Sequence, residues 1–227
     1  MRLAIEGDLR FLSHRDCARV IERAAARARL PLAYTRGFNP HPVLSLPCPR
    51  PVGVASRDDL AVLELTEPIG PDEIVTRMNR HVPPGMIFTG AVMLDRGESP
   101  RPRRVCCEWP VPPDRAGPLR RKVQEFRLAE RWPVERRTPP KRHGQPPRSR
   151  TLDLKLLVQG IAVDSDTLFW TLAPSGDLWA RPAEVLEALG LDGCADLAAV
   201  VRTAVDYGLP GAPAAVADPP GAPLTHS

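Results

Sequence analysis

The sequence has few aromatic residues and no long uncharged apolar run. Aromatic residues make up 5% of the 227 residues and hydrophobic residues 43%, so a core must consist mainly of leucine, valine and alanine. No apolar run approaches the ~20 residues that span a membrane, and we find no signal peptide. With an odd count of five cysteines, these absences predict a soluble protein of the reducing cytoplasm that does not bind a membrane.

Sequence motifs for metals and common cofactors are also missing. The five cysteines show no C-x-x-C spacing, which argues against a zinc knuckle or an iron–sulfur cluster. There is no Walker A motif, no G-x-G-x-x-G, no G-x-S-x-G and no H-E-x-x-H. We therefore expect neither a metal nor a cofactor.

Acidic residues are absent from one long stretch, between Glu22 and Asp58, which carries six arginines. The whole chain has 31 basic and 27 acidic residues, a formal charge of +4, and only three of the basic residues are lysines. Arginine suits bidentate phosphate contacts better than lysine does, so the stretch could bind an anionic partner. The plainer explanation is a GC-rich genome, whose codons favour arginine.

The hydrophobic pattern predicts an α/β (α+β) fold made of two ferredoxin-like halves with antiparallel sheets. Over residues 1–94 the predicted elements follow the order βαββαβ, which is typical of an antiparallel sheet with two helices on one face. We expect strands at residues 2–11, with a turn at 6–8, at 32–35 with a continuation at 43–46, at 60–65 and at 86–93. Helices are expected at residues 13–29 and 70–81.

The rest of the chain is predicted to form a linker, a second half and a tail. Residues 95–104 are polar and proline-rich, as in a linker. Residues 105–207 form a second α/β half, ending in a helical segment over 197–207, and a diverged repeat of the first half is one interpretation. Residues 208–227 are glycine, proline and alanine without a core pattern, and we expect a disordered tail there.

Two histidines are weak catalytic candidates. His14 begins the first predicted helix, where the positive end of the helix dipole disfavours a charged ring, so it could act as a general base. His41 stands between two prolines that fix its backbone. No carboxylate or nucleophile has a diagnostic spacing to either, and a capping or packing role for each remains the simpler interpretation.

Two basic regions are candidates for nucleic-acid binding. In the first, arginines repeat at i, i+4 along one face of the first predicted helix and continue into the loop that follows; the candidates are Arg15, Arg19, Arg23, Arg36 and Arg50. The second surrounds a predicted strand and loop, with Arg136, Arg137, Lys141 and Arg142. Basic residues interleaved with rings suit a single-stranded nucleic-acid groove. Solvated faces or a mobile loop are the alternatives.

The loop of the first region also carries Phe38, Asn39 and His41 among prolines that fix its backbone. Phe38 could stack on a base, as aromatic residues do in RNA-binding modules. It could equally be a plug that fills the core. Gly37 is a single glycine, which does not make a phosphate-binding loop.

Several segments together resemble the radical-SAM-linked proteins, a family of unknown function found beside or fused to radical SAM proteins. The segments are residues 9–16 (LRFLSHRD), 21–24 (IERA), 30–42 (LPLAYTRGFNPHP), 51–56 (PVGVAS) and 178–186 (LWARPAEVL). The resemblance covers residues 1–205 and implies a radical SAM partner and a role in RNA metabolism. It supplies no catalytic residues.

Three functions follow from these observations. The first is a non-catalytic RNA-binding accessory that presents tRNA or rRNA to a radical SAM modification enzyme. The second is a metal-independent ribonuclease that uses His14 or His41. The third is a protein–protein adaptor whose apolar loop docks the radical SAM partner.

Overall fold

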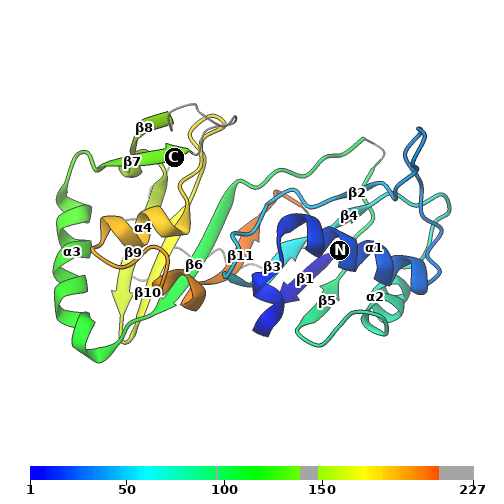
Figure 1. Ribbon diagram of the computed structural model, residues 1–227, viewed down its shortest axis with the longest axis horizontal. Helices are drawn as coiled ribbons and strands as arrows, with labels where there is room; N and C mark the ends of the chain where they lie inside the picture. Colours follow the sequence, from blue (N-terminus) through cyan, green and yellow to red (C-terminus); the bar gives the residue numbers. More distant parts are fainter. Residues whose placement is uncertain (96, 139–147, 210–227) are drawn as a thin grey trace. The chain divides into compact units, whose positions relative to one another are not determined.

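The computed structural model describes residues 1–95, 97–138 and 148–209, which form two compact units (Figure 1). Of the described residues, 1–102 and 201–209 belong to the first unit and 103–200 to the second. The fold is mixed α/β and its sheets are mostly antiparallel, which confirms the predicted class. Within the described ranges, no helix is long and apolar enough to cross a membrane.

A sheet of strands β5, β1, β3 and β11, in that order, forms the centre of the first unit. The strands are β1 (Arg2–Ile5), β3 (Ala55–Leu60), β5 (Met86–Gly90) and β11 (Val201–Asp206). β1 pairs antiparallel with both β3 and β5, whereas β11 runs parallel to β3. The unit thus includes a strand from the far end of the described chain.

Helices α1 (His14–Arg27) and α2 (Pro71–Asn79) cover one face of this sheet. Alternate residues of a strand face the same side, and Leu3 of β1 and Phe88 of β5 lie in one buried cluster with Ile21 of α1 and Met78 of α2. Ser13 is the N-cap of α1, at the predicted start of the helix, and its hydroxyl accepts a hydrogen bond from the Asp16 backbone N–H at 3.2 Å. Both predicted helices are therefore present.

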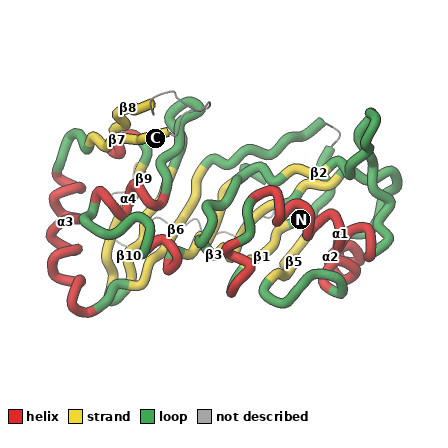
Figure 2. Tube along the Cα trace, viewed as in Figure 1, coloured by secondary structure: helices red, strands yellow, loops and turns green. Residues whose placement is uncertain are grey.

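The chain between α1 and β3 is mostly loop (Figure 2). It contains only β2 (Leu44–Ser45), which pairs antiparallel with β4 (Val62–Leu63). The strand predicted to open at 32–35 and to continue at 43–46 is reduced to β2 and two isolated bridges, Leu32–Leu65 and Tyr34–Pro42. The prolines of this stretch cannot donate to a ladder. The strand predicted at 60–65 is divided: β3 ends at Leu60, and β4 covers Val62–Leu63. Before Leu60, β3 carries the buried carboxylates Asp58 and Asp59.

The second unit has a three-stranded antiparallel sheet in the order β6-β10-β9. Its elements are β6 (Arg104–Pro110), α3 (Ala116–Leu128), β7 (Pro133–Thr138), β8 (Arg148–Asp153), β9 (Val158–Asp164), β10 (Thr167–Leu172) and α4 (Pro182–Ala188). β7 and β8 form a separate antiparallel pair. The largest buried side chains of this sheet are Trp109 and Trp170.

The helical segment predicted over 197–207 is wrong. A 3-10 turn at Asp196–Ala199 is followed by β11, which lies in the first unit. The β-branched residues Val201, Thr203 and Val205 favour a strand, and the pairing with β3 decides the conformation. The second half predicted over residues 105–207 therefore differs from the second unit of the structure, whose described residues are 103–200. The tail predicted over 208–227 lies largely outside the described residues.

Candidate functional site

The loop after α1 forms a hairpin over residues 34–42, called the 34–42 hairpin below. Tyr34 and Pro42 make an isolated antiparallel bridge. The Thr35 backbone N–H donates to the His41 carbonyl at 2.8 Å, and the His41 N–H donates to the Thr35 hydroxyl at 3.1 Å. These bonds close the hairpin at its base, and residues 36–40 form its exposed end.

Phe38 lies at the end of this hairpin with its whole side chain in solvent. Its exposure is 104% of the reference value, the highest among the exposed large hydrophobic residues. It is therefore not a core plug. Arg36, Asn39 and His41 are also exposed, so the hairpin presents one aromatic ring together with cationic and polar side chains.

The arginines predicted on the first helix lie on its exposed side. Arg15, Arg19 and Arg23 are all exposed, opposite the buried face of α1. Arg19 pairs with Asp16 at 3.0 Å, and the pKa of Asp16 is lowered by the Ser13 hydroxyl and, to a smaller extent, by Arg19. Within the described part of the chain, Arg23 and Arg36 make no side-chain hydrogen bond or ion pair.

Arg50 differs from the other described site candidates because it is buried. One of its terminal nitrogens donates to the carbonyls of Arg10, at 2.7 Å, and Val54, and its Nε lies 3.6 Å from the Asp59 carboxylate. Burial lowers its pKa, which the Asp59 charge opposes. Arg50 therefore fixes the end of the loop before β3, and its guanidinium does not lie on the surface.

A second buried arginine, Arg202 of β11, holds the same loop. It donates to the Cys48 carbonyl at 3.0 Å, the Pro49 carbonyl at 3.1 Å and the Asp59 carboxylate at 2.7 Å. Asp59 also accepts from the Ser56 hydroxyl at 2.7 Å. One carboxylate thus joins two arginines, and through them the proline-rich loop is tied to the sheet.

The carboxylate of Asp58, the residue before Asp59, also accepts hydrogen bonds from neighbouring strands. Arg2 of β1 donates to it at 2.6 Å, and the Val205 backbone N–H of β11 donates to it at 2.8 Å. Adjacent residues of β3 thus bind side chains or backbone of β1 and β11. Asp58, Asp59 and Arg202 were not recognised from the sequence.

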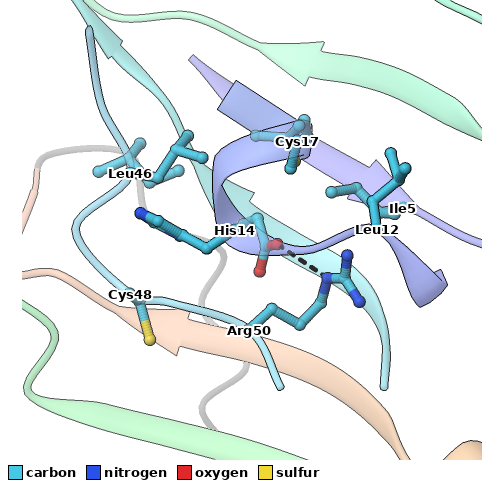
Figure 3. Close-up of a pocket in the computed structure, with 10 residues that line it drawn as sticks. Ile5, Leu12, His14, Cys17, Leu46, Cys48 and Arg50 are labelled. Atoms are coloured by element: carbon cyan, nitrogen blue, oxygen red, sulfur yellow. Dashed lines mark ion pairs between the residues drawn. The ribbon is translucent and has the colours of Figure 1, made fainter. Parts of the chain in front are cut away.

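A cavity of about 20 Å³ lies between α1 and the loop, lined by His14, Cys17, Cys48, Arg50 and Asp59 among others (Figure 3). That volume holds about one water molecule. Burial raises the pKa of the Cys17 thiol to about 11 and also raises that of Cys48, although the Arg202 charge opposes the latter shift. Neither thiol is therefore an activated nucleophile at neutral pH.

The two histidine candidates do not share this cavity. His14 is among its lining residues, but His41 is not and lies in the 34–42 hairpin. Among the described residues, no three His, Cys, Asp or Glu side chains are grouped so that they could hold a metal ion.

In the second basic region the two described candidates have different environments. Arg136 donates to Glu184 of α4 at 2.6 and 2.7 Å and to the Trp179 carbonyl at 2.6 Å, and Glu184 raises its pKa. It therefore holds β7 against α4. Arg137 is 78% exposed and pairs with Glu135 at 3.4 Å. Lys141 and Arg142 lie outside the described residues.

The sequence indicates the buried ion pairs of Asp58, Asp59 and Arg202 only in part. Residues 55–60 read Ala-Ser-Arg-Asp-Asp-Leu, and adjacent charges before an apolar segment usually indicate a turn. Because buried charges require partners, recognising a strand here would have predicted buried arginines. Nothing in the sequence identifies Arg202 as one of them.

The chain was also compared with known proteins. The family model described as "Uncharacterized protein conserved in bacteria (DUF2344)" matches residues 1–179. The comparison with curated proteins gave no match. The match covers most of the chain and includes the 34–42 hairpin, β3 and both helices of the first unit. The chain therefore belongs to this bacterial family, DUF2344.

Proposed function

We propose that this protein is a non-catalytic RNA-binding accessory that presents tRNA or rRNA to a radical SAM modification enzyme. The observation that carries the RNA-binding part is Phe38, whose ring is fully exposed at the end of the 34–42 hairpin. A fully hydrated phenyl ring gains by stacking on another ring, and unpaired nucleotides offer such rings. The radical SAM partner is inferred from the sequence resemblance alone.

Two exposed arginines of the first unit support the same proposal. Arg36 is two residues from Phe38, and Arg23 lies on the exposed face of α1; neither is engaged by an acidic side chain in the described structure. An arginine that has no acidic partner is available for a phosphate group. Arg50 and Arg136 have no part in the proposal, because their guanidinium groups bind carbonyls and carboxylates of the protein itself.

The anchoring of the loop explains how the hairpin could be presented in a fixed conformation. Arg50 and Arg202 hold residues 48–54 by hydrogen bonds to backbone carbonyls. The other end of the loop is held by the Leu32–Leu65 bridge, and the hairpin is closed at Thr35 and His41. A surface that is ordered before binding loses less conformational entropy on association.

The experiment is a filter-binding titration of the protein with a single-stranded RNA oligonucleotide across a range of salt concentrations. We expect the logarithm of the binding constant to fall linearly with the logarithm of salt concentration, since phosphate contacts release counterions. Absence of binding at low salt, or binding without a salt slope, contradicts the proposal. Duplex DNA of the same length serves as the comparison ligand.

Cleavage of RNA by His14 or His41 is the second candidate. His14 lines a cavity together with Arg50 and Asp59 (Figure 3), but the cavity has room for about one water molecule and none for a nucleotide. The geometry therefore favours binding over catalysis. Cleavage of RNA in EDTA that is lost in His14→Ala or His41→Ala would favour the ribonuclease instead.

A further inference from the structure

A large groove in the first unit combines an apolar floor with an acidic rim. Its volume is about 1000 Å³. Most residues that line it belong to β2, to β4, to the chain next to these strands, or to the segment that follows β5. Its floor is defined here as Leu44, Leu63 and Leu65, lining residues that are partly buried and pack against the core. In this groove Val92 and Met93 are exposed by 45% and 55%, respectively. A groove of this size can hold several apolar side chains.

The charged side chains among the described residues that line the groove are of one sign. Among the described residues that line it, four are acidic (Glu64, Glu67, Asp95 and Glu98) and none is lysine, arginine or histidine. Arg96 follows Asp95 in the sequence but lies outside the described residues. The chain as a whole carries a formal charge of +4. An acidic surface on a basic protein therefore marks this groove as different from the rest of the molecule.

The acidic groups are free to act on a ligand. The Glu64 and Glu67 carboxylates make no side-chain hydrogen bond or ion pair within the described part of the chain, and both residues are exposed. Glu98 accepts a hydrogen bond from the Asp95 backbone N–H at 3.1 Å. Neither carboxylate pairs with a cationic side chain of the described residues.

We infer that this groove binds a segment of another protein that carries apolar side chains flanked by lysine or arginine. The apolar floor requires hydrophobic side chains, whose burial drives association, and the acidic rim selects a cationic segment over a neutral or anionic one. RNA and anionic lipid headgroups are repelled by the same carboxylates. The groove is thus a second binding surface, independent of the RNA contact proposed for the 34–42 hairpin.

The test uses the full chain and fluorescein-labelled peptides in an anisotropy titration. One probe is an amphipathic peptide of leucine and lysine, the second replaces every lysine by glutamate, and the third replaces every leucine by serine. We expect the leucine–lysine peptide to bind at least about tenfold more tightly than either of the others. Equal binding of all three peptides, or no binding of the first, overturns the inference.

Variants connect the binding to this groove. In Glu64→Lys/Glu67→Lys, two rim charges are reversed, and we expect binding of the leucine–lysine peptide to weaken at least about tenfold. The control Glu130→Lys/Asp177→Lys makes the same change of net charge at exposed positions of the second unit and should leave binding unchanged. An equal loss in the control overturns the inference.

Met93→Ser tests the apolar lining of the groove separately, since Met93 is more than half exposed and its replacement should not disturb folding. It should weaken binding of the leucine–lysine peptide. Unchanged binding in both groove variants contradicts the proposed site, because the peptide must then bind elsewhere.

Discussion

Arg202 and Asp59 form a buried ion pair in which Nη1 of the arginine donates to the carboxylate at 2.7 Å. They are 143 residues apart in the sequence, and 4% of Arg202 and 8% of Asp59 are exposed. The same arginine binds the carbonyls of Cys48 and Pro49. The pair therefore connects the last described strand to β3 and to the loop that leads into it.

Asp59→Asn should destabilise the protein strongly. It leaves two buried arginines, Arg50 and Arg202, without their shared negative charge, and breaking a buried pair from one side typically costs about 3–5 kcal/mol. The free energy of unfolding from urea titration measures the loss. Arg77→Ala, which removes an exposed pair with Glu73 on α2, is the control and should cost less than about 1 kcal/mol. Similar losses in the two variants would contradict the account.

Thiol reactivity should distinguish one cysteine from the other four. Cys194 is exposed, whereas Cys17, Cys106 and Cys107 are buried and Cys48 is half-buried. Burial also raises the pKa of Cys17 and Cys48, and a protonated thiol reacts slowly. A thiol-reactive chromophore at neutral pH should label Cys194 rapidly and the other four only after denaturation. Rapid labelling that persists in Cys194→Ser would show that at least one of the other four cysteines is accessible in the folded protein, which contradicts the prediction.

Stability should decrease at alkaline pH, in part because of Cys17. Its pKa is raised from 9.0 to about 11 in the folded state, so the unfolded chain loses this proton first as pH rises. The contribution of the protonated Cys17 thiol to the free energy of unfolding is complete below about pH 9 and is lost as pH rises to about 11. Denaturation midpoints across this window should fall less steeply in Cys17→Ala than in the parent protein. Parallel curves would exclude Cys17 as a cause.

Two arginines should account for part of the salt dependence of RNA binding. Arg23 and Arg36 are exposed and have no acidic partner in the described structure. If each contacts one phosphate of a single strand, Arg23→Ala/Arg36→Ala should reduce the salt slope by about 1.4. Arg120→Ala/Arg121→Ala, at exposed positions of α3, is the matched control. An unchanged slope in the first variant would exclude these arginines as phosphate contacts.

Local signals predicted the helices well. Ser13 as the cap of α1, the buried residues Cys17, Ile21, Ala24 and Ala25 at helical spacing, and Pro71 at the first position of α2 are all visible in the sequence and present in the structure. These features act between residues close in the chain, so a single sequence is enough to recognise them.

Long-range pairing was not predictable in the same way. β11 was taken for a helical segment because its conformation depends on β3, which begins almost 150 residues earlier. Arg50 was assigned to an exposed interface because its charge was visible in the sequence, whereas its partners, the Val54 and Arg10 carbonyls and Asp59, were not. Charged residues of a sequence show where binding is possible, and only the fold shows which of them are already bound within the protein.

The exposed ring of Phe38 was one of two alternatives in the sequence, and the structure removes the core-plug alternative. Because the ring makes no core contact, Phe38→Ala should leave the free energy of unfolding unchanged within about 0.5 kcal/mol. This property allows its part in binding to be measured without a change in folding.

The most direct measurement is the affinity of the Phe38→Ala variant for single-stranded RNA at one fixed salt concentration. Loss of one base–aromatic stacking contact costs about 1–3 kcal/mol, so we predict an affinity about 5-fold to about 150-fold weaker than that of the parent protein. Leu128→Ala, which removes a side chain of a residue 75% exposed in the second unit, should bind as the parent does. Equal affinities of all three proteins would contradict the proposal that the 34–42 hairpin binds RNA.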